Sequence, residues 1–426
     1  MRSHTLAVPM LLACAVVITA CGDSTAPTPS NPRSEVVTQS DGRSVFERYV
    51  AIGTSISMGW QSDGVNAVMQ SEAWTAQLAH LAGRDLNLPL ISGTGCRAPL
   101  IAPLASGTRT NGEAAALPAA QAACAPLQTG IELPARNVAI AGARTSDALG
   151  TTLENQTDVF YQKLYSRILP PGQTQLMAAL LLKPKFVSIE LGANEVMGAR
   201  SGVAIPGATI VPFAVWAPQY TKVVETVARQ VKRGVLVGLI NDVATFPSFR
   251  RGAELYADRA AFLGGFHVQV SSDCDNSQNV LFVAVRVATA VATGLAQKAR
   301  GLGPYVLSCA DGGQGTQDFV LTPNEQRVVN AVLAEMNAHI ATTARQNDFA
   351  VVYLEELFGR PDLKPPFSVV QFMTSQNPYG PLMSLDGIHP SVQGHAILAA
   401  GAVRVINEKY GYGIGTNTVL AFARRP

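Results

Sequence analysis

Residues 49–55 read YVAIGTS, which is four apolar residues, a glycine, a threonine and then Ser55. A short, continuous apolar run predicts a strand that is buried on both faces, as in a parallel sheet, and the glycine after it predicts a tight turn. Ligands of open parallel sheets bind beyond the carboxyl ends of the strands. We therefore predict that Ser55 lies at the ligand-binding edge of such a sheet.

Further runs of the same kind, separated by helical patterns, lie at 138–141, 186–191, 235–240 and 349–354. The clearest helix start is 322–325, which combines a threonine N-cap, a first-turn proline and a capping-box glutamate. We predict further helices after Ser71 and, following Pro218, over 219–233. Alternating strands and helices predict an α/β fold. We expect one domain from 45 to 426, with an insertion at 251–321.

Composition excludes some classes of function. The net charge is +2, only 15% of the residues are charged, and no stripe of basic residues appears, which argues against a nucleic-acid surface. No Cys-x-x-Cys or His-x-x-x-His spacing suggests zinc, so we expect no metal site.

The N-terminus is predicted to direct export. Residues 1–20 contain Arg2, a short apolar stretch and small residues before Cys21, which is typical of a signal peptide. Cys21 resembles the lipid-modified cysteine of the bacterial lipobox, and 21–44 is polar enough to be a flexible tether. We therefore predict a lipoprotein attached to a membrane of the cell envelope. An ordinary secretory signal that contains a cysteine is the alternative.

Setting aside Cys14 and Cys21, four cysteines remain in the folded part. An even number of cysteines in an exported protein predicts disulfides, and we favour the local pairs Cys96 with Cys124 and Cys274 with Cys309. Four free, buried thiols are the alternative.

Near the C-terminus, Asp386 and His389 stand three residues apart in a segment interrupted by glycine and proline. Serine needs a neighbouring imidazole to take its proton, and that imidazole needs a third group to orient it. Ser55, His389 and Asp386 together supply a hydrolytic triad. An esterase is the leading interpretation.

At this point the sequence resembles the GDSL, or SGNH, hydrolase family, including bacterial lipoprotein members. The resemblance spans most of the folded part, because four blocks recur in family order: GTSI at 53–56, NVAIAGA at 137–143, GANE at 192–195 and DGIHP at 386–390. The resemblance implies a three-layer αβα sandwich with a mainly parallel, five-stranded, flavodoxin-like sheet.

The resemblance also implies roles for the residues in these blocks. Ser55 is the expected nucleophile, His389 the base and Asp386 its orienter. Ser55, Gly142 and Asn194 are the expected oxyanion donors, and no cofactor is expected. Thr54 and Glu195 depart from the family pattern, which has Asp at both positions.

The sequence specifies the substrate less well. Trp60 follows the serine closely, and the apolar segment 196–216, with Phe213 and Trp216, predicts either a wall or lid over an acyl chain or an arm packed on the sheet. We expect hydrolysis of lipid or short-chain acyl esters. Carbohydrate deacetylation is the second hypothesis, and a non-catalytic surface-binding module is the third.

Other polar residues are assigned no chemistry. We interpret Ser57 as a solvated or helix-start serine, and the pair Glu355-Glu356 as a solvated strand end. The remaining histidines are expected to serve packing or the surface: His80, His267, His339 and His395.

Overall fold

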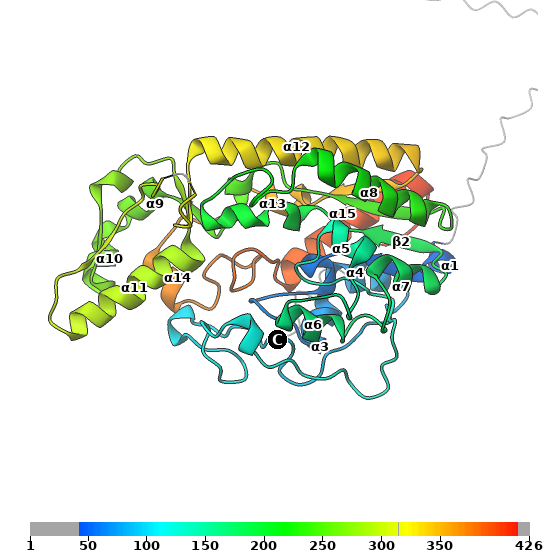
Figure 1. Cartoon of the computed structure of the whole chain (residues 1–426), viewed down its shortest axis with the longest axis horizontal. Helices are drawn as coiled ribbons and strands as arrows, with labels where there is room; N and C mark the ends of the chain where they lie inside the picture. The colour runs from blue at the N-terminus through cyan, green and yellow to red at the C-terminus, as the bar shows by residue number, and fades with distance from the viewer. Residues whose placement is uncertain (1–41, 314, 416–426) are drawn as a thin grey trace, which may run out of the picture. The chain divides into compact units, whose positions relative to one another are not determined.

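The structure, a computed structural model, describes residues 42–313 and 315–415. A parallel sheet of four strands forms the centre of this part of the chain (Figure 1). The predicted signal peptide at 1–20, Cys21 and the tether as far as residue 41 lie outside these residues. The strand order is β1-β2-β3-β9, with every neighbouring pair parallel. The strands are β1 (Tyr49–Ile52), β2 (Phe186–Ile189), β3 (Gly234–Gly238) and β9 (Ala350–Tyr353).

The predicted fifth strand at 138–141 does not form, so the predicted count of five is wrong by one. Residues 136–140 do run beside β1 in parallel, but they share one isolated bridge with it, between Ala51 and Asn137. The Asn137 side chain accepts a hydrogen bond from Ala139 N at 3.1 Å and donates to Ser57 O at 2.8 Å. The backbone then turns, because Ala143 N donates to Ile140 O at 3.2 Å, so the pairing with β1 ends after three backbone hydrogen bonds.

Helices cover both faces of the sheet (Figure 1). On one face α8 and α12 pack together, with α5 and α7 beside them, and on the other α4 packs against α15. The bounds on the first face are α5 (Thr145–Gly150), α7 (Gln175–Leu181), α8 (Phe213–Ala228) and α12 (Pro323–Gln346). The others are α1 (Arg43–Phe46), α2 (Ser55–Met58), α3 (Ala67–Glu72), α4 (Trp74–Leu81), α6 (Val159–Tyr165), α13 (Glu355–Phe358), α14 (Val369–Thr374) and α15 (Val392–Tyr410).

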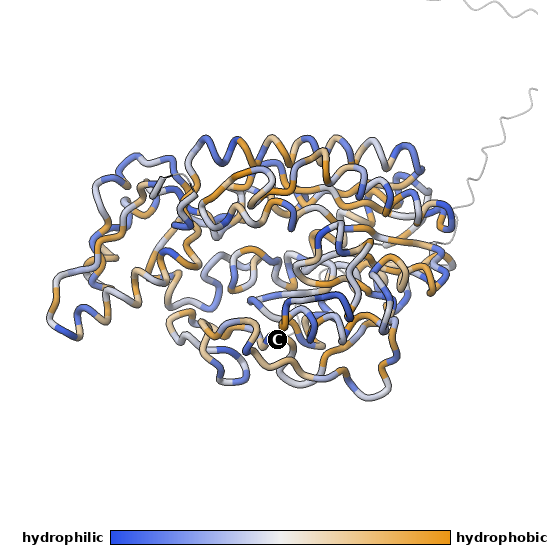
Figure 2. The backbone as a smooth tube through the Cα atoms, viewed as in Figure 1, coloured by the Kyte–Doolittle hydropathy of each residue, from blue (hydrophilic) through white to orange (hydrophobic). Residues whose placement is uncertain are grey.

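The predicted start of α12 is confirmed. Glu325 N donates to Thr322 Oγ1 at 3.2 Å, and Thr322 N donates back to Glu325 Oε2 at 2.9 Å, which is the reciprocal capping box. Hydrophobic and hydrophilic turns alternate along this helix in Figure 2, and its apolar positions are buried toward the sheet.

The helix predicted at 219–233 instead starts at Phe213 and ends at Ala228. Pro218 lies inside α8 rather than before it. Pro218 is the sixth residue of α8, so its missing N–H removes one interior backbone hydrogen bond, and the helix continues through it despite that cost.

Between β3 and β9 the chain leaves the parallel sheet. A three-stranded antiparallel sheet and a two-stranded pair form within 249–321, and Figure 1 shows the helices α9, α10 and α11 grouped there. The strands are β4 (Phe249–Arg251), β5 (Val268–Val270), β6 (Val280–Phe282), β7 (Tyr305–Leu307) and β8 (Val320–Leu321), and the helices are α9 (Gly252–Ala257), α10 (Arg259–Phe266) and α11 (Val283–Ala299). We call residues 249–321 the inserted segment.

Both predicted disulfides, Cys96–Cys124 and Cys274–Cys309, are present. Among the described residues, no helix is both long enough and apolar enough to cross a membrane.

Candidate active site

The turn that carries Ser55 requires glycine at position 53. A Cβ atom on Gly53 would lie 2.6 Å from Ser57 Oγ and 3.1 Å from Glu190 Oε2, closer than atoms approach without displacement. The strand β1 can therefore pass directly into α2, whose first residue is Ser55. This places Ser55 beyond the carboxyl end of β1, as predicted.

Glu190 lies buried beneath this turn, at the end of β2. It accepts hydrogen bonds from Thr54 N at 2.9 Å, from Thr54 Oγ1 at 2.7 Å and from Ser57 N at 3.3 Å. Burial raises the pKa of Glu190, and the hydrogen bonds from Thr54 and Ser57 oppose that rise. Glu190 therefore fixes the start of α2 through two residues that flank Ser55.

The same contacts give Thr54 a physical reason. Its hydroxyl donates to Glu190, whereas the Asp of the family pattern would place a second carboxylate beside a buried one. Sequence reasoning missed Glu190, although an acidic residue inside the apolar run 186–191 was the available signal.

Ser55, His389 and Asp386 are brought together in the order that the triad requires. His389 Nε2 lies 2.9 Å from Ser55 Oγ, and His389 Nδ1 lies 2.9 Å from Asp386 Oδ2. The hydrogen bond between Ser55 and His389 joins residues 334 positions apart. The arrangement positions an imidazole to take the serine proton.

Asp386 is held as a carboxylate. Its oxygens accept from Ile388 N and His389 N, both at 2.9 Å, and from Asp63 N at 2.8 Å. Burial raises the pKa of Asp386, but the His389 ring and the N–H groups of His389 and Ile388 outweigh it and lower the pKa from 3.8 to about 2. Asp386 is thus ionised at neutral pH and able to orient the ring.

The loop that supplies Asp63 N is held in an unusual conformation. Ser62 and Asp63 have φ angles of 52° and 55°, in the left-handed region that residues other than glycine seldom adopt. Arg97 and Arg109 each donate to Asp63 Oδ2 at 2.6 Å. No sequence pattern indicates this cluster, which holds the loop whose Asp63 N–H donates to the Asp386 carboxylate.

The predicted oxyanion residues face the same cavity as Ser55. Gly142 has a φ of 78°, and a Cβ atom there would lie 2.1 Å from the Tyr161 hydroxyl, so only glycine fits. Asn194 donates through Nδ2 to Ala143 O at 2.8 Å, which fixes the orientation of its amide. Both residues therefore line the cavity at Ser55 in fixed conformations.

Glu195, the second departure from the family pattern, does not line the cavity at Ser55. It is buried and accepts from Thr145 N, at the start of α5, at 2.7 Å. Burial raises its pKa and the hydrogen bonds to Thr145 oppose that rise. Its contacts are therefore structural.

A cavity of about 480 Å³ opens at Ser55. Trp60, one of the residues predicted for the substrate wall, lines it together with the start of the segment 196–216. Its lining also includes Ile56, Asp63, Arg97, Gly142, Arg144, Asp158, Phe160, Tyr161, Asn194, Val196, Met197, Arg200, Leu239, Ile240, Phe246, Leu333, Leu354 and His389.

Phe213 and Trp216 do not line this cavity, so their assignment to the wall is corrected. Trp216 is fully buried and donates to Thr145 Oγ1 at 2.9 Å, while Phe213 packs against the rings of Trp216 and His339. The start of the segment 196–216 forms a wall, and its end is the packed arm of the alternative interpretation.

The remaining candidates lie outside the cavity lining. His395 is buried in α15, and burial together with the His389 charge lowers its pKa to about 3, so it is a neutral packing residue. Ser57 is not solvated but buried in α2, where its hydroxyl accepts from Trp74 Nε1 at 3.2 Å. Glu355 and Glu356 open α13, and Glu356 pairs with Arg404.

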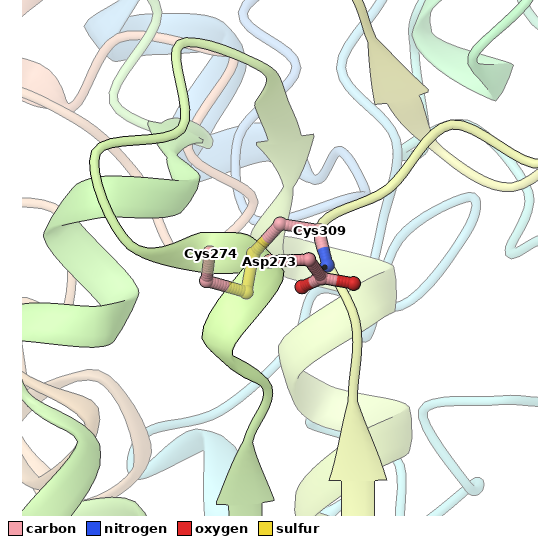
Figure 3. Close-up of side chains that lie close together, drawn as sticks. All are labelled: Asp273, Cys274 and Cys309. Atoms are coloured by element: carbon pink, nitrogen blue, oxygen red, sulfur yellow. Dashed lines mark hydrogen bonds between the residues drawn. A yellow bond between two sulfur atoms is a disulfide. The ribbon is translucent and has the colours of Figure 1, made fainter.

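One cluster in the inserted segment has the residue types of a metal site. Figure 3 shows Asp273 beside the Cys274–Cys309 disulfide. The sulfurs are bonded to each other and offer no thiolate, and the Asp273 carboxylate accepts from Ser308 Oγ at 2.5 Å and Cys309 N at 3.0 Å. These contacts give the carboxylate a structural role.

Comparison with known proteins identifies the family of this chain. The model of the GDSL-like Lipase/Acylhydrolase family matches residues 49–402. No curated protein matches the sequence.

Solved structures with detectable likeness are distant. An extracellular lipase from Streptomyces rimosus is 13% identical, with a TM-score of 0.35, and the alignment covers 85% of this chain and 98% of that one. An acetylxylan esterase from Geobacillus stearothermophilus is also 13% identical, with a TM-score of 0.32 and coverage of 84% and 93%.

Proposed function

This chain belongs to the GDSL-like lipase/acylhydrolase family and is a carboxylic ester hydrolase, and from that premise we propose that it cleaves its substrate through an acyl-serine intermediate on Ser55. The single observation that carries the proposal is the continuous hydrogen-bonded path from Ser55 Oγ through His389 to Asp386.

In the first half-reaction His389 Nε2 takes the Ser55 proton as Oγ attacks the acyl carbon. The resulting oxyanion accepts hydrogen bonds from the backbone N–H groups of Ser55 and Gly142 and from the Asn194 amide. The tetrahedral intermediate collapses, the bond to the alcohol oxygen breaks, and His389 returns the proton to that oxygen. The alcohol leaves and the acyl group remains on Ser55.

In the second half-reaction a water molecule gives its proton to His389 and attacks the acyl carbon. Collapse of the second tetrahedral intermediate releases the carboxylic acid, and His389 protonates Ser55. Asp386 remains a carboxylate throughout and stabilises the imidazolium that forms twice in each cycle. Water is the only co-reactant.

Labelling with a fluorophosphonate tests the nucleophile. We expect stoichiometric labelling that peptide mapping assigns to Ser55 and that the Ser55→Ala variant loses. Ser57→Ala is the matched control, because Ser57 lies two residues away but is buried against Trp74, and this variant should still label. A folded protein that remains unlabelled would favour the non-catalytic binding module instead.

For the substrate we propose lipid or short-chain acyl esters, supported by the apolar side chains that line the cavity. Carbohydrate deacetylation is the second candidate, because Trp60, Phe160 and Tyr161 bring aromatic rings to the same cavity. A ladder of p-nitrophenyl esters from acetate upward distinguishes them. Trp60→Ala should alter the chain-length preference, whereas Phe213→Ala, outside the cavity, should not.

We also propose that the protein is exported and lipidated on Cys21. The two disulfides support export, because such bonds persist in oxidising compartments. Mass spectrometry of the membrane fraction should find a diacylated Cys21 as the mature N-terminus, and Cys21→Ala should abolish that species. A mature N-terminus elsewhere would favour the ordinary secretory signal.

A further inference from the structure

The cavity at Ser55 is apolar on the side of β3 and β9. Leu239 and Ile240 follow β3, and Leu354 follows β9, so the strand order places them together on one side of the serine. Phe246 and Leu333 complete this apolar end. An acyl chain bound here removes its apolar surface from water by packing against these side chains, which are already buried in the free protein.

The opposite side of the cavity is charged. Beyond β1 it is lined by Asp63, Arg97, Arg144 and Asp158. Arg200, from the 3₁₀ turn Met197–Ser201, adds to this side, and its charge opposes the rise in the Tyr161 pKa that burial causes. Arg200 and Tyr161 are therefore close to each other, and Tyr161 adjoins Gly142.

The two acidic groups at this end are already engaged. Asp63 accepts from Arg97 and from the buried Arg109, while Asp158 caps α6 by accepting from Phe160 N at 2.9 Å and Tyr161 N at 3.0 Å. Three arginines, Arg97, Arg144 and Arg200, line the cavity against these two carboxylates. The charged end retains an excess of positive charge.

Arg144 and Arg200 have no such partner. Over residues 42–313 and 315–415, neither guanidinium forms a hydrogen bond or an ion pair with the protein, and both are exposed at the cavity. Arg144 stands two residues after Gly142, and Arg200 six residues after Asn194, so each follows a proposed oxyanion donor closely. Planar guanidinium groups bind carboxylate and phosphate groups bidentately.

We infer that the natural substrate is an ester of an apolar acyl group with an anionic alcohol, whose carboxylate or phosphate is bound by Arg144 and Arg200. The acyl chain occupies the end formed by Leu239, Ile240 and Leu354. This inference rests on the proposed function, because it assigns the two sides of the ester to two sides of Ser55.

The test compares two substrates that differ by one charge, the octanoyl ester of nitrophenol and the octanoyl ester of a hydroxynitrobenzoate. Each kcat/KM is divided by the alkaline hydrolysis rate of the same ester, which removes the difference in intrinsic reactivity. We expect the wild type to prefer the anionic ester. The double variant Arg144→Gln, Arg200→Gln should lower that preference by about tenfold or more.

Arg300→Gln is the matched control, because Arg300 is an exposed arginine at the end of α11, outside the cavity lining. It should leave both rates unchanged. Because the preference is a ratio measured on one preparation, partial misfolding of a variant cancels. The preference should also weaken with added salt, since both arginines are exposed.

The outcomes separate this inference from the proposed function. If the wild type hydrolyses neither ester, the proposed function fails. If it hydrolyses these esters but prefers the anionic member neither in this pair nor in the pair of octanoyl glycerol phosphate and octanoyl glycerol, or if the double variant keeps the preference, the inference is overturned. Octanoyl glycerol phosphate compared with octanoyl glycerol then distinguishes the anion, because a preference confined to this pair identifies phosphate and one shared by both pairs identifies a general anion site.

Discussion

Two regions of the chain are closed by a disulfide, and they differ in what they contribute to the cavity. Cys96 and Cys124 are 28 residues apart and enclose Arg97, Arg109 and Ala119, of which Arg97 and Ala119 line the cavity. Cys274 and Cys309 are 35 residues apart in the inserted segment. Among the described residues of that segment, none lines this cavity.

The difference shows that similar covalent closures serve different purposes. In the first region the residue after Cys96 is Arg97, whose guanidinium donates a hydrogen bond to the Asp63 carboxylate. Asp63 N in turn donates to the Asp386 carboxylate. In the second region the disulfide packs against Asp273, whose partners are Ser308 and Cys309. The first closure supports the chemistry, while the second supports only the inserted segment.

The carboxylates Asp386 and Asp273 sharpen this comparison, because each accepts backbone N–H groups of a loop. We expect Asp386→Asn to lower kcat/KM by roughly 10⁴-fold, since the amide no longer stabilises the imidazolium. Asp273→Asn is the matched control and should leave kcat/KM unchanged. Steady-state kinetics with a p-nitrophenyl ester measure both, and a loss below tenfold for Asp386→Asn would contradict the assignment.

Removing each disulfide in turn tests the difference between the two regions most directly. The closed loops are of similar length, so Cys96→Ser with Cys124→Ser, and Cys274→Ser with Cys309→Ser, should each lower the free energy of unfolding by about 3.5 to 4 kcal/mol. Urea denaturation measures these losses.

Activity should separate the two disulfide variants where stability does not. At urea concentrations where both disulfide variants are still folded, kcat/KM should fall by about tenfold when the Cys96–Cys124 bond is removed. The reason is that Arg97 is then less well placed against Asp63. It should not change when the Cys274–Cys309 bond is removed. Equal activity in both variants would show that the first closure is not coupled to the site.

Acid should act on the catalytic region through Asp386. Because its pKa is lower in the folded protein, the carboxylate stabilises the fold above pH 3.8, and that contribution is lost as the pH falls toward about 2. The loss is roughly 2 kcal/mol. Urea denaturation at several pH values should show it in the wild type and in Asp273→Asn, whereas Asp386→Asn should lack this component.

We expect the smallest effect from substituting Asp63 or Glu254, each of which forms an ion pair with a buried arginine. Asp63→Asn should lower kcat by about tenfold, since the loop that donates to Asp386 loses its ion pairs with Arg97 and Arg109. The matched control is Glu254→Gln, which removes the partner of the buried Arg250 in the inserted segment. It should leave kcat unchanged while lowering stability, and a parallel fall in kcat would mean that both effects reflect stability alone.

Much of the fold followed from local patterns. The runs at 49–52, 186–191, 235–240 and 349–354 became strands because continuous apolar runs need burial on both faces. The run at 138–141 did not become a strand for a reason that the pattern does not contain, since the backbone turns at Ile140, where Ala143 N donates to Ile140 O. Phe213 and Trp216 were apolar as noted, but apolarity does not say which surface a side chain covers.

The sequence by itself determined the parallel sheet, the disulfide pairs and the residue types of the triad, because these depend on periodicity, on short loops and on chemistry that few residues supply. Only the tertiary structure decided how Ser55 and Asp386 are held. Glu190 meets Thr54 across 136 residues, and Asp63 meets Asp386 across 323. Such contacts leave no local pattern, because their partners meet only after the chain has folded.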